Sequence, residues 1–581
     1  MNLSCSVPKS PSKKSSPTDG TISDKVDVAN AFNTFFCNIG SEIGKTFDDS
    51  LPKVDSFVSS NPYVIPSITP DFVLTEIKQM ADGKATGIDG ISVKLLKLAG
   101  DSIVSPLTFL YNMSISKGVF PSDWKKAKVT PIFKTGDPTL VNNYRPVSVL
   151  CVLSKILEKH VHNTFYDYLS KNQLLSGCQF GFRPHHSTDT ALLSIVDKWL
   201  QNIDEGFLTG AVFIDLRKAF DTVNHSVLLH KLKAYDVSPL SLKFFLSYLS
   251  DRSQAVCYSG AMSDFSPISI GVPQGSILGP LLFILNINDY PKCLKHSLVT
   301  MYADDTSQSV RDKSIDSLEM KMTEDLQCTI QWMRENKLSL NLSKTQCMLI
   351  GSAQKLAKCR ELKISVDNLS IETVQSAKLL GVYVDNCLSW KEHINYVSKK
   401  ISRKIGVLRR LRPFMSNDVL TKVYQSIVFP HFIYCSVVWC EVSNKSYIQK
   451  ISRLQKRATR ILLNVKDVLT PSIFLFKQLK WLPIEEYFTF RKATLAFKIL
   501  HGDTPEVLCS LFTYVRDVTS RNTRSSVSNK FYIPLARTKY FKRSFVYTCS
   551  VLLNGISESI RNSCSVTVFK HKYLQELFSK F

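Results

Sequence analysis

The stretch Tyr302-Ala303-Asp304-Asp305 decides the fold of this chain, because it places two adjacent carboxylates directly after a strand-like run. Residues 297–302 are β-prone, and the polar residues 306–308 after the pair favour a tight turn. Well upstream, Asp215 ends the apolar run 210–214, which is typical of a buried strand. If these two strands are neighbours, three carboxylates converge at one edge of a sheet.

Such a group of carboxylates favours metal-ion chemistry. Clustered acids repel one another unless cations neutralise them. Hard oxygen ligands suit Mg²⁺, which keeps several waters and also binds substrate phosphates. Two such ions a few ångströms apart are the usual arrangement for in-line phosphoryl transfer. An Asp-Asp pair after a strand is on its own more often a simple turn, so the interpretation depends on the other motifs of the chain.

Further motifs follow one another in a fixed order around these carboxylates. They are a Gly-rich loop at 83–90, Asn143-Tyr-Arg145-Pro-Val-Ser148, Gln179-Phe-Gly-Phe-Arg183, Phe213-Ile-Asp215-Leu-Arg-Lys-Ala-Phe220-Asp221, Gly271-Val-Pro-Gln274-Gly275-Ser-Ile-Leu-Gly279-Pro280 and Lys378-Leu-Leu-Gly381-Val-Tyr-Val-Asp385. With them the chain resembles the reverse transcriptases of non-LTR (LINE-like) retrotransposons, in particular the jockey type. The resemblance extends from about residue 65 to 390, and Tyr-Ala-Asp-Asp is the signature of that family.

The resemblance implies a right-hand polymerase fold of the α+β class, with fingers and palm on an antiparallel sheet and a helical thumb. We predict a disordered linker at 1–22, a helical connector at 23–64, fingers and palm at 65–390, a basic helical thumb at 391–465 and a basic C-terminal extension of unclear fold at 466–581. In the family, a stretch similar to the connector joins an upstream endonuclease to the polymerase. This chain is therefore expected to begin inside that connection. Whether the endonuclease is lost, encoded separately or outside the given sequence stays open, and an endonuclease supplied elsewhere is a candidate partner.

The resemblance also implies the catalytic residues and the reaction. Asp215, Asp304 and Asp305 are the implied catalytic and metal-binding residues, and the backbone carbonyl of Leu216 is a further implied metal ligand. The implied cofactor is a pair of Mg²⁺ ions, for which Mn²⁺ can substitute. The implied activity is the extension of a DNA primer with dNTPs on a template RNA. Because adjacent residues of an extended chain point to opposite sides, we expect loss of Asp305 to be less harmful than loss of Asp304.

A second group of residues is assigned to the triphosphate of the incoming nucleotide. Basic residues near a β-turn suit this role, since Lys supplies a point charge and Arg a bidentate fork. The resemblance puts Lys134 and Arg145 at these positions, and Lys125, Lys126 and Lys128 compete with Lys134 for the role.

Three more residues are expected beside the sugar and the base. The resemblance makes Phe220 the aromatic wall that excludes a 2′-hydroxyl, with an ordinary core Phe as the alternative. Gln274 offers donors and acceptors to the nucleotide, and Gly275 permits close approach of the backbone to a ligand. Asp221 is expected to cap the following helix.

The formal charge of +24 is concentrated in one part of the chain. Residues 391–581 contain 33 Lys and Arg against 11 Asp and Glu, whereas residues 1–390 are nearly balanced. Such segregation is typical of a surface that binds a phosphate backbone, because a merely solubilising charge would be spread more evenly. Apolar residues at three- and four-residue steps from 394 to 411 predict an amphipathic helix. Its polar face carries the candidate nucleic-acid contacts Lys399, Lys400, Arg403, Lys404, Arg409 and Arg410.

Composition excludes several other classes of protein. No apolar run reaches the length of a membrane span, and the Ser, Pro and Lys-rich N-terminus has no apolar core of a secretory signal. The 15 cysteines form no C-x-x-C pair, and Cys435 and Cys440 do not complete a zinc site. We therefore expect thiols in a reducing compartment, and a protein of the cytoplasm and nucleus that uses no membrane.

Two alternatives remain open. A catalytically inactive or domesticated relic of such an element would bind nucleic acid without polymerising, although every named catalytic position is filled. A group II intron-type maturase or telomerase-like polymerase would share the carboxylates, but the thumb-side sequence resembles the LINE-like elements.

Overall fold

The computed structural model describes residues 24–44, 47–48, 50–366, 369–440, 445–467, 469–518 and 530–580. The predicted linker at 1–22 lies outside these residues. The chain divides into two compact units, and each is described by itself. Unit 1 combines the described residues up to 176 with 216–294 and 327–341, and unit 2 combines 177–215, 295–326 and the described residues from 342 onward. The linear domain ranges expected from the sequence cut across these units and stay predictions.

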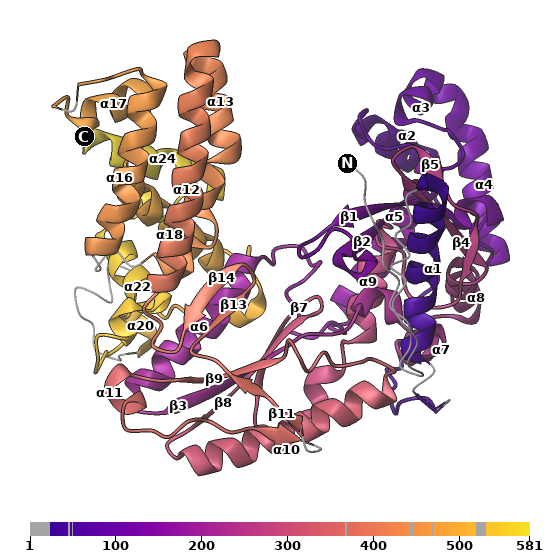
Figure 1. Ribbon diagram of the computed structural model, residues 1–581, viewed down its shortest axis with the longest axis horizontal. Helices are drawn as coiled ribbons and strands as arrows, with labels where there is room; N and C mark the ends of the chain where they lie inside the picture. The colour runs from indigo at the N-terminus through magenta and orange to yellow at the C-terminus, as the bar shows by residue number, and fades with distance from the viewer. Residues whose placement is uncertain are drawn as a thin grey trace. The chain divides into compact units, whose positions relative to one another are not determined.

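Unit 2 contains the sheet that carries the Asp-Asp pair (Figure 1). Its strands, in spatial order, are β12 (Glu372–Thr373), β9 (Gln346–Ile350), β3 (Leu208–Ile214), β8 (Asp305–Asp312) and β7 (Leu298–Tyr302). All neighbours in this sheet are antiparallel except β12 and β9, which run parallel. The predicted strands ending at Ile214 and Tyr302 are therefore confirmed.

Helices cover both faces of β3, which explains why its sequence is a continuous apolar run rather than an alternating one. Ala211 faces the cluster that includes residues of α6 (Thr188–Asp204). Its neighbour Gly210 faces α10 (Ile315–Glu335), where an added Cβ would lie 2.1 Å from the sulfur of Met322. The strand therefore has no solvent face, and α10 approaches it closely only because residue 210 has no side chain.

Helices make up most of the remainder of unit 2. The hairpin β13 (Ser376–Leu379) and β14 (Val382–Asp385) precedes α12 (Lys391–Leu411), α13 (Asn417–Ile427), α14 (Phe429–Ile433), α15 (Ser436–Trp439) and α16 (Lys445–Leu462). After them come α17 (Ser472–Leu479), α18 (Ile484–Leu500), α19 (Glu506–Cys509), α20 (Val515–Val518), α22 (Phe545–Gly555), α23 (Glu558–Arg561) and α24 (Val566–Ser579). No helix in the described ranges combines the length and the apolar character needed to cross a membrane.

Two cores hold these helices together. One joins α6, β9 and β14 to α12, α13 and α16, and it contains the apolar stripe of α12 that the sequence predicts. The other joins α18, α22 and α24 around Phe497, Phe545 and Phe569. The extension at 466–581, whose fold the sequence left unclear, thus contains several helices in its described part, and their core also includes Leu193 of α6 and Val437 of α15.

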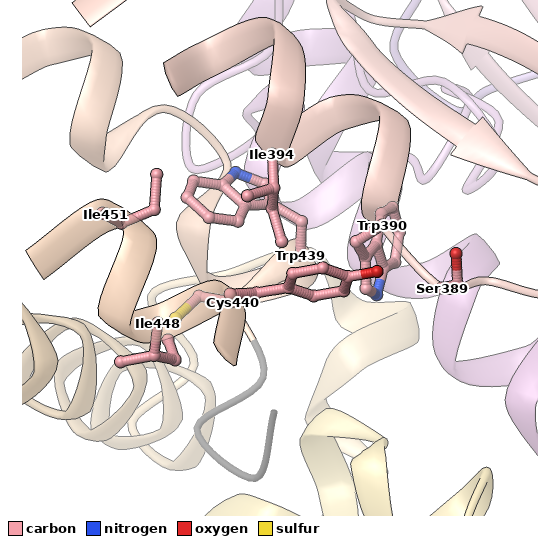
Figure 2. A pocket seen from close by; sticks show the side chains of 8 residues that line it. Ser389, Trp390, Ile394, Trp439, Cys440, Ile448 and Ile451 are labelled. Carbon is pink, nitrogen blue, oxygen red and sulfur yellow. The ribbon is translucent and has the colours of Figure 1, made fainter. Parts of the chain in front are cut away.

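The interior between α12, α15 and α16 is closely packed. Figure 2 shows Trp390, Trp439 and Ile394 around a cavity of about 10 Å³. Such a space is at the lower limit for one water molecule, so it is a packing void and not a ligand site. Cys440 lines it as well, and both Cys435 and Cys440 are buried cysteines outside any disulfide, as the sequence predicts.

Unit 1 is built on a second sheet, in the order β2 (Tyr144–Val149), β1 (Lys126–Phe133), β4 (Arg252–Tyr258) and β5 (Ala261–Met262), with β6 (Ser266–Ile268) also paired to β4. Its helices are α1 (Lys25–Gly44), α2 (Pro70–Gln79), α3 (Val93–Ala99), α4 (Val104–Lys117), α5 (Val152–Lys171), α7 (His225–Ala234), α8 (Pro239–Leu249) and α9 (Leu278–Asn286). The predicted connector begins with α1, which packs on this sheet through Phe32 against Tyr144 and Tyr258. The connector helix is therefore part of the core of unit 1.

Asp197 of α6 joins two parts of unit 2 that are far apart in sequence. Its carboxylate accepts hydrogen bonds from the backbone N–H groups of Phe545 and Val546, at 2.7 and 2.9 Å, in the first turn of α22. Burial raises the pKa of Asp197 to about 6, although these hydrogen bonds and nearby Lys492 act in the opposite direction. The first N–H groups of α22 thus donate to a side chain of α6 and not to water.

We predict that Asp197→Ala lowers the free energy of unfolding by about 2–4 kcal/mol, because two buried N–H groups lose their acceptor. Urea denaturation measures the loss, and amide hydrogen exchange locates it at residues 545 and 546. Asp517→Ala, at an exposed position of α20, is the control and should change stability by less than about 0.5 kcal/mol. Equal stability of the two variants would contradict this role of Asp197.

Candidate active site

The Asp-Asp pair occupies a two-residue hairpin between β7 and β8. Tyr302 pairs with Asp305, so Ala303 and Asp304 form the turn itself. Ala303 has a φ of +56°, a left-handed conformation that costs a residue with a side chain about 1–2 kcal/mol. Asp304 is half-buried and Asp305 is exposed. The turn therefore holds a strained backbone directly before the first carboxylate.

Asp215 reaches the same end of the sheet through the antiparallel register of β3 and β8. Ile214, the last residue of β3, pairs with Thr306, the second residue of β8. Asp215 consequently stands at the level of Asp305 and the hairpin turn. The strands that carry the three carboxylates are neighbours, as expected, and their catalytic roles stay predictions.

The donor set fits a divalent ion that completes its coordination with substrate oxygens. Within the described part of the chain, no group of three or more His, Cys, Asp and Glu side chains is arranged to hold a metal ion by itself. Mg²⁺ does not require such a cage, because it is usually bound by one or two carboxylates together with waters and substrate phosphates. Carboxylates on neighbouring strand ends supply donors of this kind.

Gln179 stabilises the hairpin turn by hydrogen bonds, a role that the sequence analysis missed. Its side-chain oxygen accepts hydrogen bonds from the N–H of Ala303 at 3.0 Å and of Gly181 at 2.7 Å. The backbone around Gln179 also pairs with Met301 of β7. A Cβ on Gly181 would lie 2.3 Å from the nitrogen of Ala303, so only glycine permits this approach. The motif that contains Gln179 was visible in the sequence, but nothing in it showed which turn the side chain would reach.

In unit 1, Lys134 and Arg145 lie on one face of the β1–β2 hairpin. Arg145 pairs with Ile132, and the N–H of Lys134 continues the pairing to the carbonyl of Asn143 at 2.9 Å. Residues two apart on a strand share a face, so the Lys134 and Arg145 side chains are diagonal neighbours. Both residues are exposed. The pair can therefore present two positive charges to one anionic group.

Of the three lysines that compete with Lys134 for the triphosphate, one is buried and one lies beside a carboxylate. Lys125 is only 8% exposed, and its burial lowers the pKa of its ammonium group. The ammonium of Lys126 lies 3.6 Å from the carboxylate of Asp123. Lys128 lies on β1, which ends just before Lys134, and is half-buried.

Phe220 is half-buried and stacks on Phe283 of α9, with ring centroids 4.3 Å apart and planes 19° apart. This contact is the core packing that the sequence left open as the alternative, and the role of Phe220 as a wall against a 2′-hydroxyl stays a prediction. One face of the ring packs like a core residue, and that packing fixes the position of the part that stays exposed.

Gln274 and Gly275 lie in one loop, and each contacts another residue of unit 1. The Gln274 side-chain amide donates to the carboxylate of Asp221 at 2.7 Å. Gly275 has a φ of +132°, and an added Cβ would lie 2.2 Å from the carbonyl oxygen of Ser148. The close approach predicted at Gly275 is therefore made, in this structure, by the backbone of the chain itself. The cap of α7 comes from Asn224 instead of Asp221, so the predicted capping role of Asp221 is wrong.

Glu158 supports the far end of the same loop. Its buried carboxylate accepts hydrogen bonds from the N–H groups of Ile277 and Leu278, at 2.8 and 3.3 Å, where α9 begins. Burial raises the pKa of Glu158, and these hydrogen bonds act against the shift. Glu158 lies within α5, far from any motif, so its role could not be predicted from the sequence.

Comparison with known proteins supplies an independent observation. Residues 128–384 match the family model described as reverse transcriptase (RNA-dependent DNA polymerase). The chain is 30% identical over 405 residues to the RNA-directed DNA polymerase from mobile element jockey of Drosophila melanogaster, which covers 68% of this chain and 44% of that relative. It is 28% identical over 446 residues to the probable RNA-directed DNA polymerase from transposon BS of the same species, which covers 74% and 48%. The chain spans less than half the length of these curated relatives.

We predict that Gln179→Leu speeds amide hydrogen exchange at Ala303 and Gly181, because both N–H groups lose their acceptor inside the protein. The free energy of unfolding should fall by about 2–4 kcal/mol. The matched control is Gln331→Leu, at an exposed position of α10, which should leave both quantities unchanged. Unaltered exchange at Ala303 in Gln179→Leu would show that the turn does not depend on this side chain.

A second prediction concerns pH. Burial raises the pKa of Asp221 to about 6, against the lowering effects of Gln274, Lys218 and Arg145. The folded state thus holds this proton more tightly than the unfolded state, so its contribution to stability is lost as pH rises from about 4 to about 6. Asp221→Asn removes the titration, and its unfolding free energy should therefore rise relative to wild type over that interval. Urea denaturation of both proteins at several pH values measures the difference, and a constant difference would contradict the assignment.

Proposed function

Because the chain belongs to the reverse transcriptases of non-LTR retrotransposons, we propose that it is an RNA-directed DNA polymerase. The observation that carries the proposal is the strand register that brings Asp215 to the level of the Asp304-Asp305 hairpin, inside the matched residues 128–384. Reverse transcriptases have a right-hand polymerase fold and use divalent metal ions, and the mixed helices and antiparallel sheet of this chain are consistent with that fold.

In the proposed reaction, the 3′-hydroxyl of a DNA primer attacks the α-phosphate of a dNTP, and pyrophosphate leaves. Two divalent ions, when bound, favour ionisation of the hydroxyl and neutralise the charge that develops on the pyrophosphate. Asp215 and Asp304 would hold them, with Asp305 and the Leu216 carbonyl as further donors. Mg²⁺ is the proposed ion because all these donors are hard oxygens, and Mn²⁺ is the proposed substitute.

We propose that unit 1 binds the incoming nucleotide. Arg145 and Lys134 share one hairpin face and would neutralise the triphosphate. Phe220, backed by Phe283, would form the wall that meets a 2′-hydroxyl. Gln274 and Gly275 would border the nucleotide and the template base. The Asp221 carboxylate orients the Gln274 amide, so the loop would meet the nucleotide already ordered.

The basic face of α12 is the proposed contact with the primer–template backbone. The apolar stripe of this helix is buried, and its opposite side is exposed at all six positions expected from the sequence, namely Lys399, Lys400, Arg403, Lys404, Arg409 and Arg410. This arrangement supports the proposal that α12 to α16 act as the thumb and residues 65–390 as fingers and palm. The proposed partners are template RNA, a DNA primer and dNTPs, with action in the cytoplasm and nucleus.

We predict that Asp304→Asn lowers the rate of Mg²⁺-dependent dTTP incorporation on oligo(dT)-primed poly(rA) by at least about 100-fold, or about 3 kcal/mol of transition-state stabilisation. Asp305→Asn should cost only about tenfold, because Asp305 already belongs to β8 and points away from its neighbour. Asp316→Asn, on the exposed side of α10, is the control.

A greater loss in Asp305→Asn than in Asp304→Asn would reverse the assigned roles. If wild type is inert and yet binds primer–template with a steep salt dependence, the chain is a nucleic-acid-binding relic and the polymerase proposal fails.

A further inference from the structure

The helices α18 and α22 lie in the C-terminal part of unit 2 (Figure 1). They border a cavity of about 250 Å³ whose lining includes none of the proposed catalytic or nucleotide-binding residues. It lies where the end of α18, the pairing of Tyr514 with Phe531, and the helices α22 and α23 meet. On the same measure one water molecule needs about 10–15 Å³, so this C-terminal cavity has room for a ring-sized group.

Two aromatic pairs form its walls. Tyr514 stacks on Phe531, with ring centroids 4.7 Å apart and planes 27° apart. His501 stacks on Phe497, with centroids 3.9 Å apart and planes 24° apart. Phe497 and Phe531 are buried, whereas the rings stacked on them are nearer to solvent. The outer rings are therefore held in place before any ligand arrives, which reduces the entropy lost when a further ring packs beside them.

Basic groups accompany these rings. The guanidinium of Arg516 lies 4.7 Å from the centre of the Tyr514 ring and adds a cation to that aromatic pair. Arg561 lines the cavity as well, at the end of α23. No Asp or Glu is among the described lining residues, and the Asp517 carboxylate, which lies 3.6 Å from the Arg516 Nε, is exposed. A cavity with two guanidinium groups and no carboxylate favours an anionic ligand, and guanidinium groups bind phosphate through paired hydrogen bonds.

Three polar side chains complete the lining. The Nδ1 of His501 lies 2.9 Å from the carbonyl oxygen of Phe497, which can only accept, so Nδ1 donates and Nε2 is the acceptor of the neutral ring. The Ser563 hydroxyl donates to the carbonyl of Ile560 at 2.7 Å and keeps its acceptor capacity. Asn562 offers both donors and acceptors. These groups can recognise the edge of a base or a sugar hydroxyl.

We propose that the C-terminal cavity binds one unpaired nucleotide of a single-stranded nucleic acid, with the phosphate at Arg516 and Arg561 and the base beside the ring walls. Unpaired bases are bound by aromatic, His and Arg planes combined with positive charge at the backbone, and the cavity combines these features. An acidic peptide would satisfy the charges but would leave the ring walls unused. The inference goes beyond the proposed polymerase function, because such binding requires neither metal nor dNTP.

The first experiment is photo-crosslinking of the full chain, in EDTA and without dNTPs, to a ten-nucleotide oligo(U) that contains one 4-thiouridine. We expect crosslinks at His501, Tyr514 or Phe531 that excess unlabelled oligo(U) removes. Crosslinks confined to other parts of the chain would overturn the proposal. The same experiment with 4-thiothymidine in oligo(dT) distinguishes an RNA strand from a DNA strand as the source of the nucleotide.

The second experiment compares Arg516→Gln with the matched control Arg537→Gln. Both arginines are exposed, and only Arg516 lines the cavity, so neither substitution should alter thermal unfolding. Fluorescence anisotropy with oligo(U) should give about three- to tenfold weaker binding for Arg516→Gln. The slope of log K against log salt should decrease by about 0.7, the value for one lost phosphate contact on a single strand. Equal affinities and slopes for the two variants would overturn the proposal, whether or not the chain polymerises.

Discussion

The antiparallel pairing of β3 with β8 is the constraint on which the candidate active site depends. Ile214 pairs with Thr306, and Tyr302 pairs with Asp305 across the following hairpin. These two registers together bring the residue after β3 to the level of the turn between β7 and β8. A slip of one residue would turn every side chain of β3 to the opposite face, so Ala211 would lose its place against α6 and Gly210 its place against α10. Burial of both faces therefore fixes the position of the carboxylates.

The hairpin turn is held in a conformation that it would not favour alone. Ala303 has a positive φ, and such strain persists only where the surroundings determine the backbone. Here the Gln179 side chain accepts a hydrogen bond from the N–H of Ala303. Gly181 has no side chain, so its backbone can lie close to that of Ala303. The segment around Gln179 thus acts as an added strand beside β7. The buried side-chain amide of Gln179 therefore holds the turn, and with it the backbone of Asp304, in one position.

The nucleotide-binding candidates of unit 1 are ordered by the same kind of contact. Gln274 is oriented by Asp221, Gly275 lies against the Ser148 carbonyl, and Glu158 satisfies the first N–H groups of α9. A loop that is bonded at both ends before substrate arrives loses little entropy on binding. The C-terminal helices follow this pattern too, because Asp197 of α6 provides the acceptors for the start of α22. In each case a buried carboxylate or amide satisfies backbone groups of a distant segment.

The sequence by itself determined the elements that depend on local pattern. Apolar runs and helical spacing predict the strands before Asp215 and Asp304, the helix at the start of the connector and the amphipathic α12, and the structure contains all of them. Motif order was sufficient to indicate the family. Only the tertiary structure decided which polar groups meet. Gln179, Glu158 and Asp221 act on segments far away in the chain, and no local pattern encodes the partner of a buried side chain. The C-terminal cavity has the same origin, since its rings and guanidinium groups come from separate helices that only the packed core brings together.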